Sequence, residues 1–299
     1  MRAISRLQGR VAIVTGAGRG LGRAHALALA AGGAAVVVND LGGDVHGEGS
    51  DGTPAQQVVG EITAAGGRAV ASGHDVSDWV QAEQLIDLAL EAFGDVHVLV
   101  NNAGILRDRT IANLEEEEWE AVVRVHLKGH AAMIRHAMAY WRAQSKAGRD
   151  VRASIINTTS VAGFAGNFGQ AAYAAAKLGI VGLSRVAALE GARYGVRSNA
   201  ISPSARTRLE GGLVPADGEL DRFAPANVSP LVAWLAEEGC PATAQVFQIY
   251  GDRLLIVAMP APVHRLENGA RWTPEALDAA LTNRLLVPPE ISDFVEGVG

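Results

Sequence analysis

Features that would mark a secreted or disordered protein are scarce in this sequence. Its one cysteine, Cys240, has no partner for a disulfide within the chain and suits a reducing compartment. Aromatic residues make up only 5% and charged residues 19% of the 299 residues, whereas 48% are hydrophobic. This composition excludes intrinsic disorder and is sufficient to fill a large globular core.

The chain also lacks a charge pattern or an apolar segment that would direct it to nucleic acid or to a membrane. Its 26 Lys and Arg residues are outnumbered by 32 Asp and Glu and form no basic stripe. The longest apolar-rich stretch, 24–38, is interrupted by His25, Gly32 and Gly33 and is too short to span a bilayer. The first residues lead into a strand pattern without the apolar core of a signal peptide. We therefore expect a cytoplasmic protein that binds neither nucleic acid nor membrane.

Short aliphatic runs alternate with longer helical patterns along most of the chain. The runs expected to form buried strands are residues 11–14, 35–38, 68–71, 96–100, 154–157, 196–201 and 254–257. The helices expected between them are residues 20–31, 54–65, 78–93, 114–145 and 173–194. This alternation predicts the α/β class, with a parallel sheet covered by helices on both faces. We assign residues 1–257 to this domain and 258–299 to an extension that packs on it or on a neighbouring subunit.

Two acidic segments invite a metal-site interpretation, but local structure explains them better. Residues 115–118, all glutamate, overlap a potential capping box at 113–116, so we expect them to form a solvated first helical turn. The Gly- and Asp-rich residues 41–53, with His46, can bind a cation, although a plain surface loop is the simpler interpretation. We predict no metal site.

A glycine-rich turn directly follows the first expected strand. The segment Thr15-Gly16-Ala17-Gly18-Arg19-Gly20-Leu21-Gly22 leads from that strand into the first helix. Glycines allow a tight turn and a close approach of the backbone to a pyrophosphate, which rests on the helix N-terminus. Because strand and helix supply the context that the motif requires, we predict a dinucleotide-binding turn.

Asp40, at the end of the second expected strand, favours NAD over NADP. A carboxylate at this position accepts hydrogen bonds from the adenosine ribose hydroxyls. Arg19 is the counter-argument, since its guanidinium can reach a 2′-phosphate. We predict NAD, because a 2′-phosphate beside Asp40 would place like charges together.

Three residues further along suit acid–base chemistry at an alcohol carbon. Tyr173 and Lys177 are one helical turn apart on the same face, and Ser160 follows a strand at the sheet edge where ligands bind. A tyrosine with a pKa near ~10 is a poor base at neutral pH, but a neighbouring ammonium favours the phenolate. We expect Tyr173 to exchange the hydroxyl proton, Lys177 to lower its pKa, and Ser160 to hold the substrate oxygen.

Together these motifs resemble the short-chain dehydrogenase/reductase family over roughly residues 7–257. The glycine turn, Asn101-Asn102-Ala103-Gly104, Ser160 and the Tyr173–Lys177 pair occur in the family's order. The resemblance implies one Rossmann-type, doubly wound domain of about seven parallel strands, in a homotetramer or homodimer. It also places Asp75 and Val76 at the adenine and Ser202-Pro203 at the start of the stretch passing the nicotinamide. The residues expected to bind the cofactor are Gly16, Arg19, Gly20, Leu21, Gly22, Asp40, Asp75, Val76, Asn101, Ala103, Gly104, Tyr173, Lys177, Ser202 and Pro203.

One position departs from the family pattern. The family usually has an asparagine on the long helix, where it anchors a proton-relay water to the active-site lysine, and this sequence has His126 there. A histidine can also hold a water, but it can titrate near neutrality. A water-holding His126 and a satisfied core His126 both remain open.

Within the family, residues 37–43, 125–129 and 166–170 are similar to the (3R)-hydroxyacyl-CoA dehydrogenase part of the peroxisomal multifunctional β-oxidation enzyme. That group is also described as 17β-hydroxysteroid dehydrogenase type 4-like. The similarity implies a 3-hydroxyacyl-CoA thioester substrate, including steroid-derived ones, and a free-standing enzyme. Residues 204–225 are Gly- and Pro-rich and are expected to form a substrate lid. Its Arg206 and Arg208 can pair with CoA phosphates or simply face solvent.

Three other functions stay open. An NADPH-dependent 3-oxoacyl carrier-protein reductase is disfavoured by Asp40, and cofactor preference would distinguish it. A dehydrogenase of free hydroxysteroids or small alcohols is excluded by no residue. A catalytically inactive nucleotide-binding scaffold is disfavoured by the complete set of Ser160, Tyr173 and Lys177.

Overall fold

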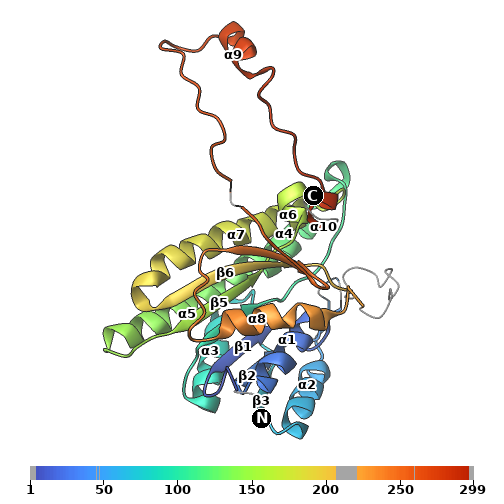
Figure 1. Ribbon diagram of the computed structural model, residues 1–299. Helices are drawn as coiled ribbons and strands as arrows, with labels where there is room; N and C mark the ends of the chain where they lie inside the picture. Colours follow the sequence, from blue (N-terminus) through green and yellow to red (C-terminus); the bar gives the residue numbers. More distant parts are fainter. Residues whose placement is uncertain (1–4, 45, 47, 207–220, 259, 296–299) are drawn as a thin grey trace.

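The computed structural model describes residues 5–44, 46, 48–206, 221–258 and 260–295. Their centre is one eight-stranded sheet of order β3-β2-β1-β4-β5-β6-β7-β8 (Figure 1). The strands are β1 Val11–Thr15, β2 Ala35–Asn39, β3 Arg68–Ser72, β4 Val98–Asn101, β5 Ala153–Thr158, β6 Val196–Pro203, β7 Val246–Tyr250 and β8 Arg253–Ile256. Neighbouring strands pair in parallel from β3 to β7, and β8 alone pairs antiparallel, with β7. The predicted parallel α/β sheet is confirmed.

The expected number of about seven strands is corrected to eight. The strand missing from the prediction is β7, in which Gln248 interrupts the aliphatic pattern. Gln248 is fully buried, and its Nε2 donates a hydrogen bond to Ser204 Oγ at 3.1 Å. Residues 254–257, expected as the last strand, largely coincide with the antiparallel β8, which follows a turn at Gly251 with φ of +54°.

Helices cover both faces of the sheet because alternate strand residues point in opposite directions. Ala12 and Val14 pack with the helices of one face, whereas Val11 and Ile13 pack with those of the other. The first face carries α1 Gly20–Ala31, α2 Thr53–Ala64 and α8 Ser229–Ala236. The second carries α3 Trp79–Phe93, α5 Gly129–Lys146 and α7 Ala171–Gly191. The shorter elements are η1 Ile111–Asn113, α4 Glu116–Val123, η2 Arg124–Lys128, α6 Ala162–Ala165, η3 Ala192–Tyr194, η5 Pro225–Asn227, α9 Pro274–Leu281 and α10 Ile291–Val295.

The long helix expected over 114–145 is divided by one turn of π-helix. Its capping box forms between Glu115 and Glu118, two residues later than predicted, and α4 then runs into the π-turn η2 before α5. A π-turn contains an extra residue, so it changes which side chains face the sheet edge, and such turns are frequent at functional sites. His126 lies in this turn.

In the described ranges, residues 171–194, which include α7, form the one helix with the length and apolarity of a membrane span. Its buried residues, among them Ala176, Ile180 and Ala188, face the interior of the domain. Since α7 packs against β5 and β6, we interpret it as a core helix.

Beyond β8 the chain leaves the body as a long arm. Figure 1 shows α9 at the far end of this arm and α10 back on the body beside α6. In the returning segment, Phe294 packs against Phe164 with ring centroids 5.6 Å apart. Side chains between α9 and α10 are largely exposed, including Leu285 at 74% and Val287 at 91%.

Candidate active site

A cavity of about 1290 Å³ opens at the carboxyl ends of the parallel strands. Its walls come from the β1–α1 turn and from the segments that follow β2, β3, β4, β5 and β6. Ligands of open parallel sheets bind at this edge. The volume exceeds the range of about 300–1,000 Å³ that holds a single drug-sized ligand, so there is room for a dinucleotide and a second molecule.

The glycine turn forms the middle of the cavity and fits a pyrophosphate. A Cβ added at Gly22 would lie 2.1 Å from the Gly16 carbonyl oxygen, and one at Gly16, with φ of +62°, would lie 2.8 Å from Ala103 Cα. Helix α1 begins here without a side-chain cap and without an acidic residue in its first turn. Its N-terminal N–H groups are therefore available to an anion, as a dinucleotide requires.

At one end of the cavity, Asp40 is fixed against the glycine turn. Its Oδ2 accepts a hydrogen bond from Gly18 N and its Oδ1 one from Gly42 N, both at 2.7 Å. Asp75 also lines this end, where its Oδ1 accepts hydrogen bonds from the backbone and hydroxyl of Ser77 at 2.8 and 2.7 Å. Hydrogen bonds from Thr53 and, to a smaller extent, the charge of Arg19 lower the pKa of Asp51.

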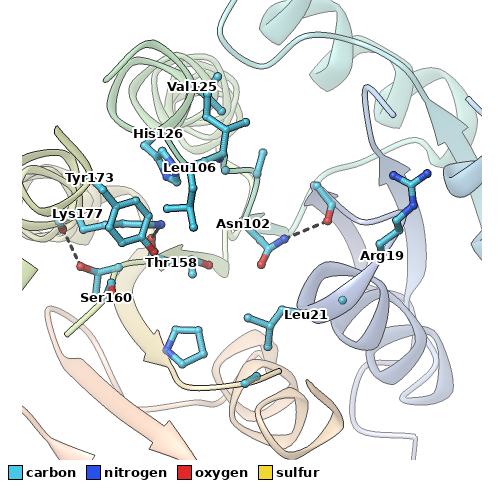
Figure 2. Close-up of a pocket in the computed structure, with 18 of the residues that line it drawn as sticks. Arg19, Leu21, Asn102, Leu106, Val125, His126, Thr158, Ser160, Tyr173 and Lys177 are labelled. Carbon is cyan, nitrogen blue, oxygen red and sulfur yellow. Dashed lines mark hydrogen bonds between the residues drawn. The ribbon is translucent and has the colours of Figure 1, made fainter. Parts of the chain in front are cut away.

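At the other end, Ser160, Tyr173, Lys177 and His126 come together. Figure 2 shows these four side chains in one corner, with Leu21 and Asn102 between them and Arg19. Lys177 Nζ donates a hydrogen bond to the Thr158 carbonyl oxygen at 2.7 Å and lies 5.4 Å from the centre of the Tyr173 ring. Burial lowers the pKa of Lys177 to about 7.

His126 is buried beside the tyrosine and is held by the chain that follows β4. Its Nε2 lies 2.8 Å from the Ile105 carbonyl oxygen, and its ring stands edge-on to that of Tyr173 with centroids 5.2 Å apart. Gly104 makes room for the imidazole, since a Cβ there would lie 2.4 Å from His126 Cε1. Burial, reinforced by the charge of Lys177, moves the pKa of His126 well below its usual value, so the ring is neutral near pH 7. Among the described residues, none hydrogen-bonds to its buried Nδ1.

Three expected cofactor residues lie behind the cavity wall instead of lining it. Asn101 is buried in the sheet, where its Nδ2 donates to Asn157 Oδ1 at 3.0 Å. Gly22 and Ser202 are likewise buried away from the cavity, Gly22 by the close approach of the turn. Asn102 lines the cavity in place of Asn101 and donates from Nδ2 to the Thr15 and Gly16 carbonyl oxygens at 3.0 and 3.1 Å. The other expected cofactor residues that line it are Gly16, Arg19, Gly20, Leu21, Asp40, Asp75, Val76, Ala103, Gly104, Tyr173, Lys177 and Pro203.

The expected lid lies largely outside the described residues, including Arg208 within 207–220. Arg206 lines the cavity, but its guanidinium pairs with Asp221 through both nitrogens. Phe223, just before η5, belongs to the expected lid and lines the cavity, and so does Ile291 of α10, which was not predicted. Nothing in the local sequence signals Ile291, because its approach to the cavity depends on the path of the whole arm.

Comparison with known proteins agrees with this geometry. A family model described as short chain dehydrogenase matches residues 10–210. The hydroxyacyl-CoA dehydrogenase ChsB1 of Mycobacterium tuberculosis is 43% identical over 291 residues, which cover 92% of this chain and 88% of that protein. The peroxisomal multifunctional enzyme type 2 of Mus musculus is 45% identical over 244 residues, which are 82% of this chain but 32% of the mouse protein.

A solved structure, a short chain dehydrogenase from Mycobacterium avium, has a TM-score of 0.86 and 53% sequence identity, covering 95% of this chain and 98% of that one. The family predicted from the motifs is thereby confirmed. A glycine turn at the start of α1 and a Tyr–Lys pair on α7, both lining one cavity, are what an enzyme needs to bring a nicotinamide to an alcohol. This chain belongs to the short-chain dehydrogenase/reductase family and is an oxidoreductase that acts on CH–OH groups.

Proposed function

We propose that this protein is an NAD-dependent dehydrogenase that interconverts a 3-hydroxyacyl-CoA thioester and the corresponding 3-oxoacyl-CoA. The observation that carries the proposal is one cavity with Asp40 fixed at one end and Tyr173, Lys177 and Ser160 at the other. The acyl-CoA assignment is supported by the hydroxyacyl-CoA dehydrogenase of M. tuberculosis, which matches over most of both chains.

The preference for NAD follows from charge at the adenosine end. Both Asp40 oxygens accept backbone hydrogen bonds, so the carboxylate is held in place beside the glycine turn. A 2′-phosphate there would meet this negative charge. Arg19 also lines the cavity, but Asp40 is bonded directly to the glycine turn, so we expect the charge of Asp40 to dominate there.

In the reaction, Tyr173 exchanges a proton with the substrate hydroxyl. The protonated form of Lys177, 5.4 Å from the tyrosine ring, favours the phenolate, and Ser160 Oγ, oriented by the N–H of Ala162 at 3.2 Å, holds the substrate oxygen. The bound nicotinamide supplies the acceptor for the hydrogen that leaves the carbinol carbon. His126 stays neutral, and its Nδ1 can hold the water through which Lys177 exchanges protons.

The substrate side of the cavity suits a long or bulky acyl group, including a steroid-derived one. Its wall contains Val161, Ala162, Phe223 and Ile291, which are apolar, next to Ser160. Burial of apolar surface contributes about 25 cal/mol per Å², so this wall favours an aliphatic chain over a small polar alcohol.

We also propose that the protein is a cytoplasmic homotetramer or homodimer in which the extension packs on a neighbouring subunit. Leu285, Leu286 and Val287 are 74%, 63% and 91% exposed in the isolated chain, and contiguous apolar side chains of this kind usually mark an interface. Light scattering of the full chain should give a dimer or tetramer, and replacing Leu285 and Leu286 with Asp should reduce the mass. A monomeric wild-type protein would refute the proposal.

The test of function is turnover with a 3-hydroxyacyl-CoA, followed by nicotinamide absorbance with NAD and NADP in parallel. We expect turnover with NAD and at least about tenfold lower kcat/KM with NADP. Free 3-hydroxy acids and hydroxysteroids at equal concentration serve as controls. Turnover of these alcohols without turnover of the thioester would refute the acyl-CoA assignment while leaving the dehydrogenase intact.

A further inference from the structure

An ion pair joins two separate segments of the cavity wall. Arg206 follows β6, and Asp221 precedes η5. The Arg206 guanidinium donates to the two Asp221 carboxylate oxygens at 2.8 and 3.0 Å. The side chains are 27% and 31% exposed, so solvent screens this pair less than a fully exposed one. A bidentate pair of this kind fixes orientation as well as distance.

Hydrogen bonds of the backbone also join the two segments that carry the pair. Arg206 N donates to the Phe223 carbonyl oxygen at 2.6 Å, and Phe223 N donates to Asp221 Oδ1 at 3.2 Å. The Asp221 carbonyl oxygen accepts a hydrogen bond from Asn227 Nδ2 at 2.7 Å. Asp221 therefore holds the start of its own segment and ties it to Arg206.

Both tied segments form part of the cavity wall and rest on the sheet. Pro203, Ser204, Ala205, Arg206 and Phe223 all line the cavity. Ser204 N donates to the Ile249 carbonyl oxygen at 3.0 Å, and the Phe223 ring stacks on Tyr250 with centroids 6.4 Å apart and planes 20° apart. The wall is thus fixed to β7 on one side and by the ion pair on the other.

The sheet order places this wall at the nicotinamide end of the cavity, because the segment after β6 lies beside the one after β5, which carries Ser160, and away from Asp40, which follows β2. The adenosine end is defined by Asp40, and the glycine turn receives the pyrophosphate in the middle. A dinucleotide laid along this path brings its nicotinamide towards Tyr173 and the segment from Pro203 to Arg206. The same wall then borders the substrate.

We propose that the Arg206–Asp221 pair is a positioning device that holds this wall against the nicotinamide and the acyl thioester, and that Arg206 is not a receptor for CoA phosphates. The part concerning the thioester rests on the proposed function, whereas the part concerning the nicotinamide does not. A phosphate that recruited Arg206 would have to displace Asp221. The hydrogen bond from Arg206 lowers the pKa of the Asp221 carboxyl, so this group is ionised at neutral pH.

The first test needs no substrate. The affinities of Asp221→Asn and Arg206→Lys for NADH and for ADP-ribose, which lacks the nicotinamide, are measured by calorimetry. Both variants keep the side-chain size nearly unchanged, but Asn removes the charge and Lys removes the bidentate fork. We expect the Kd for NADH to rise about tenfold, because this factor corresponds to the loss of one charged hydrogen-bonded contact. The Kd for ADP-ribose should stay unchanged. Unchanged NADH affinity, or an equal loss for both ligands, would overturn the positioning role.

A matched control is available on the outer surface. Arg23 of α1 makes the same kind of pair with Glu61 of α2, through Nε and one terminal nitrogen, and both side chains are 43% exposed. Arg23→Lys removes a bidentate fork without touching the cavity wall. We expect it to leave both affinities unchanged.

The second test compares two thioesters of one 3-hydroxy acid, made with CoA and with N-acetylcysteamine, which carries no phosphate. A positioning pair predicts that Asp221→Asn lowers kcat/KM by the same factor, about tenfold, for both. A phosphate receptor predicts instead that freeing Arg206 lowers KM for the CoA ester alone, which would refute the proposal. If the wild type turns over neither ester, the proposed function fails, and the ADP-ribose comparison still decides the role of the pair.

Discussion

Replacing Lys177 with methionine should make the folded protein more stable while abolishing turnover. Lys177 is 3% exposed, and burial lowers its pKa from 10.5 to about 7. At low pH the buried, protonated Lys177 therefore lowers the free energy of unfolding. The interval between 10.5 and about 7, at about 1.4 kcal/mol per pH unit, corresponds to about 5 kcal/mol. Loss of the hydrogen bond to the Thr158 carbonyl oxygen offsets about 1–3 kcal/mol, leaving a net gain of about 2–4 kcal/mol at pH 6.

The stability difference between the wild type and Lys177→Met should depend on pH. Between pH 7 and 10.5 the unfolded chain still binds the lysine proton and the folded protein has released it, so wild-type stability rises with pH in this window. The advantage of Lys177→Met is complete below pH 7 and should shrink by about 2–3 kcal/mol between pH 6 and pH 9. The charge of Lys177 also lowers the pKa of the buried His126 and His130, whereas groups away from Lys177 titrate equally in both proteins, so the difference reports on Lys177 and these two histidines.

Urea unfolding of both proteins at pH 6, 7.5 and 9, followed by tryptophan fluorescence, measures this difference. Lys146→Met, at an exposed position on α5, is the control and should show no pH-dependent change. A constant difference between pH 6 and pH 9, or a less stable Lys177→Met at pH 6, would refute the reasoning.

Three further substitutions test the site. Tyr173→Phe should lower kcat/KM by about 10²–10⁴ and leave NADH affinity nearly intact, as measured by turnover and calorimetry; unchanged turnover would sink the assignment of Tyr173. Asp40→Asn should raise the ratio of NADP to NAD kcat/KM by about tenfold or more, because the like-charge interaction with the 2′-phosphate is lost; an unchanged ratio would contradict it. Gly104→Ala should displace His126, destabilise the fold by about 1–3 kcal/mol and lower kcat, whereas Gly73→Ala, whose Cβ would meet nothing within 4 Å, should do neither.

Much of the fold could be predicted because its signals are local. The glycine turn, the aliphatic strands and the spacing of Tyr173 and Lys177 each depend on residues that are neighbours in sequence. The predicted helix 20–31 has the bounds of α1, and the predicted 78–93 differs from α3 only by its cap, Asp78, whose side chain accepts from Val80 N and Gln81 N.

The elements that were missed depend on contacts distant in sequence. Strand β7 is buried on both sides although Gln248 breaks its pattern, and Ser204, at the end of another strand, accepts the hydrogen bond of Gln248 Nε2. The π-turn at His126 leaves no sequence signature, since it is defined by backbone bonds and by the packing of the imidazole against Gly104.

In the site, too, local motifs could be predicted, whereas contacts between distant segments could not. The motif Asn101-Asn102 identifies the right segment, but only the sheet register decides that Asn101 points to Asn157 and Asn102 to the cavity. Arg206 could be found as a basic residue near the substrate, yet its partner Asp221 is set by how the chain returns to the sheet. Phe223 and Ile291 join the cavity for the same reason.

The most direct test of the central claim uses a 3-hydroxyacyl-CoA carrying deuterium on its carbinol carbon. It is incubated with NAD and the enzyme, and the reduced cofactor and the thioester product are analysed by mass spectrometry. Transfer of one deuterium to the nicotinamide, with formation of the 3-oxoacyl-CoA and slower turnover than with the unlabelled substrate, is the result expected of this site. Recovery of the labelled thioester unchanged, with the enzyme folded and binding NADH, would contradict the proposed function.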